Sequence, residues 1–195
     1  MVQIANKTKS YYTICSKASD LFHKHGIRKV SIEELCDQAG VSKMTFYRIF
    51  KNKEELVHHI IVEDFNKNLE KQQELLESDL PFSEKIKGSM NLKKETSKQY
   101  SKEFIFDLFN SKDQQIVEKM QDFGDKGRLM FRSFLEQNQK EGNIRKSLNL
   151  DFLMLYLAQL QTNIPNETAL SMFDSVEAYS EEFTSLVFYG IFSEE

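Results

Sequence analysis

A stretch of hydroxyl, basic and aromatic side chains near the N-terminus has the clearest chemical pattern in the sequence. Ser31 and Glu34 have the spacing of a capping box, which predicts that a short helix begins there and ends at Gly40. Ser42 can cap a second helix, which carries residues 43–50. Two short helices joined by a glycine-containing turn form a helix-turn-helix, whose second helix can enter the major groove of DNA.

The groups needed for catalysis or metal binding form no comparable pattern. Cys15 and Cys36 are too isolated for a disulfide framework or for a metal site with repeated ligands. His58 and His59 are adjacent, so on a helix they point about 100° apart, which is poor geometry for binding one metal ion. No nucleophile, base and orienting group stand in a recognisable arrangement, and no phosphate-binding glycine loop occurs. We therefore expect no enzymatic activity, no metal site and no cofactor.

The composition predicts an all-α protein with a basic N-terminal segment. Only 7 of the 195 residues are Gly and 2 are Pro, against typical usage of about 7% and 5%, so few residues interrupt helices. The net charge is −4, but residues 1–58 carry ten basic and six acidic side chains, whereas residues 59–195 carry sixteen and twenty-four. Such an asymmetry indicates that the basic segment contacts nucleic acid.

Apolar spacing predicts helices along most of the chain. A first helix ends at Gly26, a long linker helix begins after Asn52 and runs toward Leu76, and Pro81 marks a break after which Ser83 can cap the next helix. Gly124 and Gly127 permit a kink in the longest of the later helices. Those later helices are expected at 83–99, 101–110, 113–141, 149–163 and 167–192.

The chain has no segment typical of export or membrane insertion. No stretch approaches about 18 consecutive apolar residues, and the N-terminus has no apolar signal core. Two isolated cysteines also fit a reducing cytosol. We therefore expect a cytoplasmic protein without membrane contact.

Residues 31–56 resemble the DNA-binding segment of the TetR family of bacterial transcriptional repressors. The resemblance rests on the turn at 39–42, the third helix at 45–47 with Phe50 closing it, the start of the fourth helix at 53–56, and on Phe22 and Gly26 upstream. It covers roughly residues 8–68. It implies a three-helix DNA-binding domain at 8–68 with its helix-turn-helix at about 31–50, joined by a linker helix to a helical effector-binding and dimerisation domain at 69–195.

The resemblance also implies which side chains contact double-stranded DNA. Lys43 would donate to guanine O6 or N7, and Met44 would contact a thymine methyl group. Phe46 is an aromatic residue of the kind that more often fills the core of a three-helix unit, and Arg48 could be a solvated charge rather than a phosphate contact. The implied DNA-binding residues are Ser31, Ser42, Lys43, Met44, Thr45, Phe46, Tyr47, Arg48 and Lys53.

The C-terminal helices are implied to bind an effector and to form a homodimer. Aromatic side chains at helical spacing can also be ordinary core, and the surplus apolar surface of the last two helices fits a monomer core as well as a dimer interface. The implied effector-pocket residues, whose apolar character predicts a small hydrophobic or aromatic ligand, are Met90, Phe104, Phe109, Met120, Phe123, Phe131 and Tyr156. The implied dimer-interface residues are Leu153, Leu157, Phe183, Val187, Phe188 and Ile191.

These features together lead to one main functional hypothesis. The protein would be a sequence-specific, dimeric transcriptional repressor that a small effector releases from a palindromic operator. The alternative is an adaptor or co-activator of the same fold that acts through protein-protein contacts.

Overall fold

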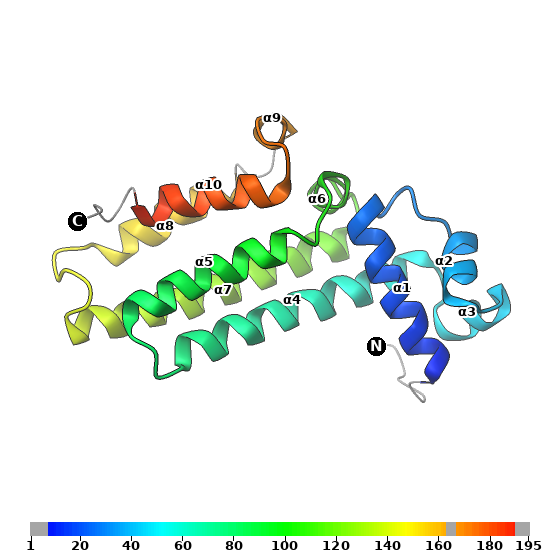
Figure 1. Ribbon diagram of the computed structural model, residues 1–195, viewed down its shortest axis with the longest axis horizontal. Helices are drawn as coiled ribbons and strands as arrows, with labels where there is room; N and C mark the ends of the chain where they lie inside the picture. The colour runs from blue at the N-terminus through cyan, green and yellow to red at the C-terminus, as the bar shows by residue number, and fades with distance from the viewer. Residues whose placement is uncertain (1–7, 163–166, 190–195) are drawn as a thin grey trace.

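The computed structural model describes residues 8–162 and 167–189, and in this part of the chain all regular secondary structure is helical (Figure 1). The prediction of an all-α protein is therefore confirmed. The helices are α1 (Lys9–His25), α2 (Ile32–Ala39), α3 (Lys43–Ile49), α4 (Lys53–Glu77), α5 (Phe82–Ser97), α6 (Lys102–Phe109), α7 (Gln114–Glu141), α8 (Leu150–Thr162), α9 (Glu167–Ser171) and α10 (Val176–Tyr189).

Short polar side chains begin most of the N-terminal helices, as the sequence predicts. The Ser31 hydroxyl accepts from the Glu34 amide at 3.1 Å, and the Ser42 hydroxyl accepts from the Thr45 amide at 3.1 Å. Asn52 caps α4 in the same way. Each bond satisfies an amide that has no partner inside its helix, so each predicted start is fixed locally.

One predicted helix cap and one predicted uninterrupted helix are wrong. Helix α5 begins at Phe82, with Pro81 rather than Ser83 before it, because the fixed φ of −56° at Pro81 suits a helix start. The predicted helix at 167–192 is interrupted between α9 and α10, where the Ser175 hydroxyl accepts from the Ala178 amide at 3.0 Å and begins a new helix. Helix α7, in contrast, runs through both Gly124 and Gly127.

The helices form a small head at one end of a long body (Figure 1). Helices α1, α2 and α3 make the head, and α4 leaves it to run along one edge of the body, where it packs against both α5 and α7. On the side away from α4, α8 packs against α7 and α10 packs against α5. Helix α6 lies where head and body meet and contacts α1. Within the described residues, no helix has the length and apolar character needed to cross a membrane.

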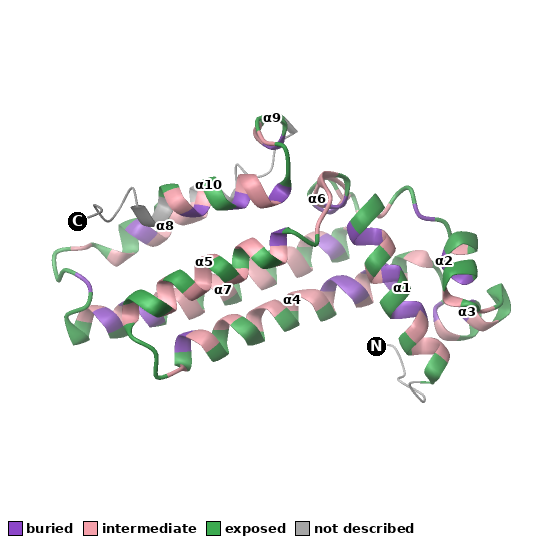
Figure 2. Ribbon diagram, viewed as in Figure 1, coloured by how far each residue is buried: buried purple, intermediate pink, exposed green. Residues whose placement is uncertain are grey.

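Two apolar cores hold these parts together (Figure 2). The first, which we call the junction core, contains buried residues of all three head helices together with Phe104 and Leu108 of α6 and Ile116 of α7. The second, the distal core, surrounds Phe134 and Leu135 at the far end of the body. Because the junction core is continuous, the head is packed onto the body rather than tethered to it.

Candidate nucleic-acid interface and ligand sites

Helix α3 has one face buried in the head and one face open to solvent. Phe46 has an exposed fraction of 0% and Phe50, just after the helix, 2%, and the two rings lie 5.9 Å apart between centroids. On the open face, Met44 is 83% exposed and Tyr47 is 54% exposed, and Arg48 is also exposed. Helix α3 therefore exposes a basic, an aromatic and a flexible apolar side chain, while its opposite face is packed into the head.

The buried position of Phe46 corrects one predicted DNA contact. A side chain without accessible surface cannot reach a base edge or a phosphate, so Phe46 has the core role that aromatic residues usually have in a small helical unit. Its ring meets the Tyr47 ring edge-on, with 5.4 Å between centroids, and so helps to orient that exposed side chain.

Lys43, the predicted guanine contact, is bound to an acid of the preceding helix. Its Nζ donates a hydrogen bond to Oε1 of Glu33 in α2. This bond raises the pKa of Lys43 and lowers the pKa of Glu33. Both side chains are exposed, so the pair contributes little to stability and can exchange for another partner.

Three further predicted contacts lie around α3. Lys53, the first residue of α4, is half-buried with its Nζ 5.9 Å from the centroid of the Phe22 ring, and burial lowers its pKa. Ser42 lies at the start of α3, and its hydroxyl is 3.0 Å from the hydroxyl of Thr45. Ser31 is exposed at the start of α2. Apart from Phe46, the structure thus leaves the predicted DNA contacts as predictions, with Lys53 the least accessible of the cations.

The cysteine in the helix-turn-helix is packed, not reactive. Cys36 has an exposed fraction of 3%, and burial raises the pKa of its thiol. A raised pKa keeps the thiol protonated, which is the less nucleophilic form.

Polar bonds attach the head to α6 and its flanks. Asp107 of α6 accepts from the Arg28 backbone amide at 2.8 Å, and its carboxylate lies 3.1 Å from Nε of the same arginine. The Ser101 amide, at the start of α6, donates to the carbonyl of His23 at 2.8 Å. These residues are about 80 positions apart in sequence, so no local spacing could have revealed the contact.

The predicted effector residues do not gather in one place. Phe104 and Met120 belong to or pack on the junction core, and Phe123 stacks on Phe65 of α4 with 4.3 Å between centroids. Phe131 packs on the distal core. The remaining three residues are spread over the body. Phe109 and Tyr156 are each 46% exposed, and Met90 is partly buried.

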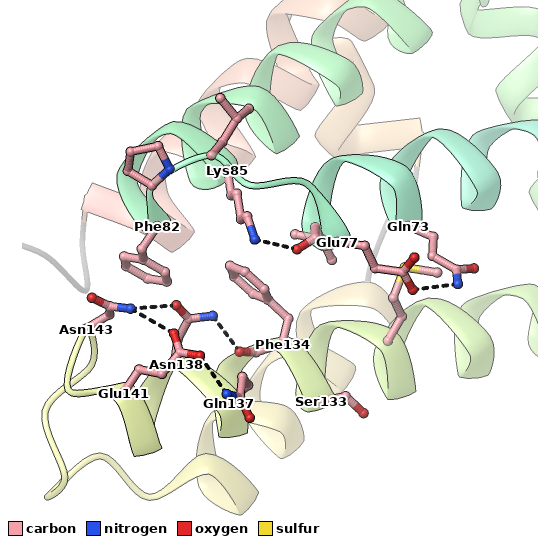
Figure 3. A pocket seen from close by; sticks show the side chains of 14 residues that line it. Gln73, Glu77, Phe82, Lys85, Ser133, Phe134, Gln137, Asn138, Glu141 and Asn143 are labelled. Carbon is pink, nitrogen blue, oxygen red and sulfur yellow. Dashed lines mark hydrogen bonds between the residues drawn. The ribbon is translucent and has the colours of Figure 1, made fainter.

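The body has a cavity of about 730 Å³ at its distal end, and none of the seven predicted residues lines it (Figure 3). Its floor includes Phe82 and Phe134, whose rings stack with 5.7 Å between centroids. Its charged groups already have partners, because Lys85 donates to the Leu76 carbonyl at 2.8 Å and the two acids accept from neighbouring glutamines. The lining residues are Gln73, Leu76, Glu77, Leu80, Pro81, Phe82, Lys85, Met130, Ser133, Phe134, Gln137, Asn138, Glu141 and Asn143.

The predicted dimer residues are only partly available. Leu153 is 9% exposed and belongs to the distal core, which corrects its assignment to an interface, and Leu157 packs against the same core. Phe183 is half-buried, while the side chains of Val187 and Phe188 and the whole of Ile191 lie outside the described residues. The surplus apolar surface predicted for the last two helices includes the exposed side chains of Phe152, Leu155 and Leu186, none of which is among the six implied interface residues.

Comparison with known proteins shows which family model and which solved structures this chain resembles. Residues 14–60 match the family model for bacterial regulatory proteins of the tetR family. The fatty acid degradation regulator FadR from Bacillus halodurans has a TM-score of 0.72 and 16% identity, over 97% of this chain and 100% of that chain. A transcriptional regulator from Cytophaga hutchinsonii ATCC 33406 has a TM-score of 0.74 and 15% identity, over 95% and 97%.

A third solved structure is a complex with a ligand. FadR from Bacillus subtilis, in complex with stearoyl-CoA, has a TM-score of 0.63 and 16% identity, over 92% of this chain and 98% of that chain. No curated protein sequence matches this chain. Residues 14–60 thus match the DNA-binding segment of bacterial regulatory proteins of the tetR family, and the chain as a whole shares the all-helical fold of these solved regulators.

Proposed function

We propose that this protein is a dimeric transcriptional repressor that binds a palindromic operator and is released from it by a small effector. The observation that carries the proposal is the open face of α3, where Met44, Tyr47 and Arg48 are exposed above the buried Phe46. A short helix that is capped at its start, packed on one face and lined with cationic and apolar side chains on its exposed face is suited to contact bases in the major groove. The excess of basic residues at 1–58 would direct the negatively charged DNA to this end.

Dimer formation is supported by the exposed apolar residues of α8 and α10. Phe152 is 68% exposed, Leu155 57% and Leu186 66%, on helices that pack against α7 (α8) and α5 (α10). Large apolar side chains left exposed on helices are typical of an interface. Two copies joined there would carry two α3 helices, as a palindrome with half-sites whole helical turns apart requires.

The direct test is the salt dependence of operator binding. DNA fragments selected by the purified protein would supply the operator, and fluorescence anisotropy would give the affinity between 50 and 200 mM salt, a range over which several phosphate contacts reduce affinity by roughly 10³-fold or more. Arg48→Ala is expected to lower the slope of log affinity against log salt by about one for each head, because one phosphate cation is lost. Tyr47→Phe is expected to weaken binding without changing the slope, since only a neutral hydroxyl is removed.

Lys87→Ala in α5 is the matched control, because Lys87 is an exposed cation of the body. Its affinity and slope should equal those of the unchanged protein. A salt slope near zero for the unchanged protein would contradict the proposal and favour an adaptor that acts through protein contacts.

The ion pair in the helix-turn-helix gives a second prediction. Glu33→Gln is expected to raise operator affinity by about two- to fivefold, because it frees Lys43 and removes a negative charge next to the DNA. The same anisotropy titration measures the effect. Glu34→Gln, on the same helix and also exposed, is the control for the loss of one acidic charge. Equal affinities of the two variants would show that the Glu33–Lys43 pair does not limit DNA binding.

A further inference from the structure

The cavity at the distal end of the body, which we call the distal cavity, has two glutamine–glutamate pairs on its edge. Gln73 donates to Glu77 at 2.7 Å, and Gln137 donates to Glu141 at 2.6 Å (Figure 3). These four exposed residues form what we call the polar rim. Because a carboxylate only accepts hydrogen bonds, each glutamine must turn its NH₂ group toward its glutamate. The amide oxygens of both glutamines are left as acceptors.

The two asparagines of the distal cavity repeat this arrangement. Asn138 is buried, and its amide nitrogen donates to the carbonyl of Phe134 at 2.8 Å. The amide nitrogen of Asn143 donates to Oδ1 of Asn138 at 3.0 Å and to Oε2 of Glu141 at 3.3 Å. All four primary amides of the lining thus have their nitrogen bonded to an oxygen of the protein. The lining is left with more acceptors than donors, which a ligand carrying N–H groups would complement.

Two helix ends add negative charge to the same cavity. Glu77 is the last residue of α4 and Glu141 is the last residue of α7. The carbonyl groups in the last turn of a helix carry a partial negative charge, so an acidic side chain is unfavourable there. Among the residues that the structure describes, each of these carboxylates is bonded only to neutral amides. A positively charged ligand atom would stabilise both.

The positive groups of the distal cavity are fewer than the negative ones. Helix α5 begins at Phe82 in the lining, and Lys85 in its first turns carries an ammonium group. That group donates to the Leu76 carbonyl at 2.8 Å, so it offsets the negative end of α4. Two carboxylates and the end of α7 then outweigh the positive end of α5, and the cavity is negative on balance.

The floor of the distal cavity is apolar and aromatic. Phe134 and Leu76 are buried, and the ring of Phe82 stacks on that of Phe134 with 5.7 Å between centroids. Ring faces attract cations as well as apolar groups. The volume of about 730 Å³ lies in the usual range for small-molecule sites. A ligand that fits this lining has a protonated nitrogen and an apolar body.

The helices that line the distal cavity also reach the head. Helix α4 contributes Leu76 to the distal core and Leu56 to the junction core, and α7 contributes Phe134 and Ile116 in the same way. The cavity lies where α4 and α7 end, at the end of the body away from the head (Figure 1). A ligand that changes the spacing of these two helix ends can therefore alter the packing next to the head.

We propose that the distal cavity binds the effector, and that this effector is an amine, protonated at neutral pH, on an apolar body. Its ammonium group donates to the carboxylates and amide oxygens of the polar rim, while its apolar body contacts the rings of Phe82 and Phe134. This inference rests on the proposed function and narrows its effector from a hydrophobic or aromatic molecule to a cationic one.

Three probes with the same apolar body test the charge. Phenylbutylamine is cationic at pH 7, phenylbutanol is neutral and phenylbutanoate is anionic. Each is titrated into the full chain and the melting temperature is followed, since a ligand that binds the folded state raises it. We expect a saturable rise with the amine and little or none with the other two probes. An equal rise with the alcohol, or a larger rise with the carboxylate, would overturn the inference.

Substitutions that remove charge locate the site. Glu77→Gln and Glu141→Gln each keep the shape of the side chain and remove one negative charge. Affinity for phenylbutylamine, measured by calorimetric titration, should fall about three- to fivefold in each variant. The variant with both changes should bind the amine no better than the alcohol.

Glu118→Gln is the control for these substitutions. Glu118 also lies on α7, is exposed and accepts from a glutamine four residues earlier, Gln114, but it does not line the distal cavity. This variant should bind the amine as the unchanged protein does. Weaker binding in Glu118→Gln, or unchanged affinity in the variant with both cavity substitutions, would contradict the proposed site.

The melting temperature without ligand separates binding from a structural role. Glu77→Gln and Glu141→Gln each remove a negative charge from the C-terminal end of a helix, so both should melt at the same temperature as the unchanged protein or slightly higher. If the carboxylates served only to hold the helix ends in place, their loss would lower the melting temperature, and the inference would fail.

Operator binding distinguishes failure of this inference from failure of the proposed function. The cavity variants leave α3 unchanged and should bind the operator normally without ligand. Saturating phenylbutylamine should weaken operator binding by the unchanged protein about fivefold or more, and by the doubly substituted variant much less. Normal salt-dependent operator binding that the amine does not change would overturn only the effector assignment, whereas a salt slope near zero would overturn the proposed function.

Discussion

Phe46→Ala is expected to lower the free energy of unfolding by about 3–5 kcal/mol, the range for truncating a fully buried aromatic side chain. Phe46 has no accessible surface and packs against Phe50 and the edge of Tyr47. Its removal leaves a cavity where α3 is seated on the head. Urea denaturation followed by circular dichroism measures the loss, and operator binding should disappear with it.

Met44→Ala is the matched control on the same helix. Met44 is 83% exposed, so its truncation should change the free energy of unfolding by no more than about 0.5 kcal/mol while altering operator preference at one base pair. The two variants thus separate the supporting face of α3 from its contacting face. A loss below about 1 kcal/mol for Phe46→Ala would mean that α3 is not seated as described.

Gly26→Ala is expected to be the second most damaging of these changes, by about 2–4 kcal/mol. Gly26 has a φ of +87°, which an alanine adopts only with strain of about 1–3 kcal/mol. An added Cβ would also lie 3.0 Å from Cβ and 3.3 Å from the backbone carbon of Glu103, so α6 would have to move. The free energy of unfolding and the hydrogen exchange of α6 amides measure these two effects.

Gly40→Ala is the matched control, because it shows the conformational part of that effect alone. Gly40 also has a positive φ, +62°, but an added Cβ would meet nothing within 4 Å. This variant should therefore show only the conformational cost, roughly 1–2 kcal/mol, and leave α6 unchanged. If Gly26→Ala were no more destabilising than Gly40→Ala, the close approach of α1 and α6 would not contribute to stability.

Sequence reasoning succeeded where a feature depends on neighbouring residues. The starts of α2, α3 and α4 follow from Ser31, Ser42 and Asn52, because each cap bonds the amide three residues ahead. The break before α10 was missed because Ser175 is also compatible with a helix interior, and its bond to the Ala178 amide decides between the two.

Features that depend on distant residues were beyond the reach of a single sequence. Phe104 and Tyr156 are both aromatic residues at helical spacing, yet one is buried in the junction core and the other is 46% exposed. Spacing shows which side chains share one face of a helix but not whether a neighbouring element covers that face.

The continuous junction core has a consequence for how such proteins can be recombined. Phe104 and Leu108 of α6 and Ile116 of α7 complete the apolar interior of the head, so residues 8–68 alone would leave it partly uncovered. A chimera that exchanges only the head between relatives would bring together two apolar surfaces whose side chains are not complementary to each other. The exchangeable unit is the head together with α6 and the first turn of α7, a module that is discontinuous in sequence and contiguous in space.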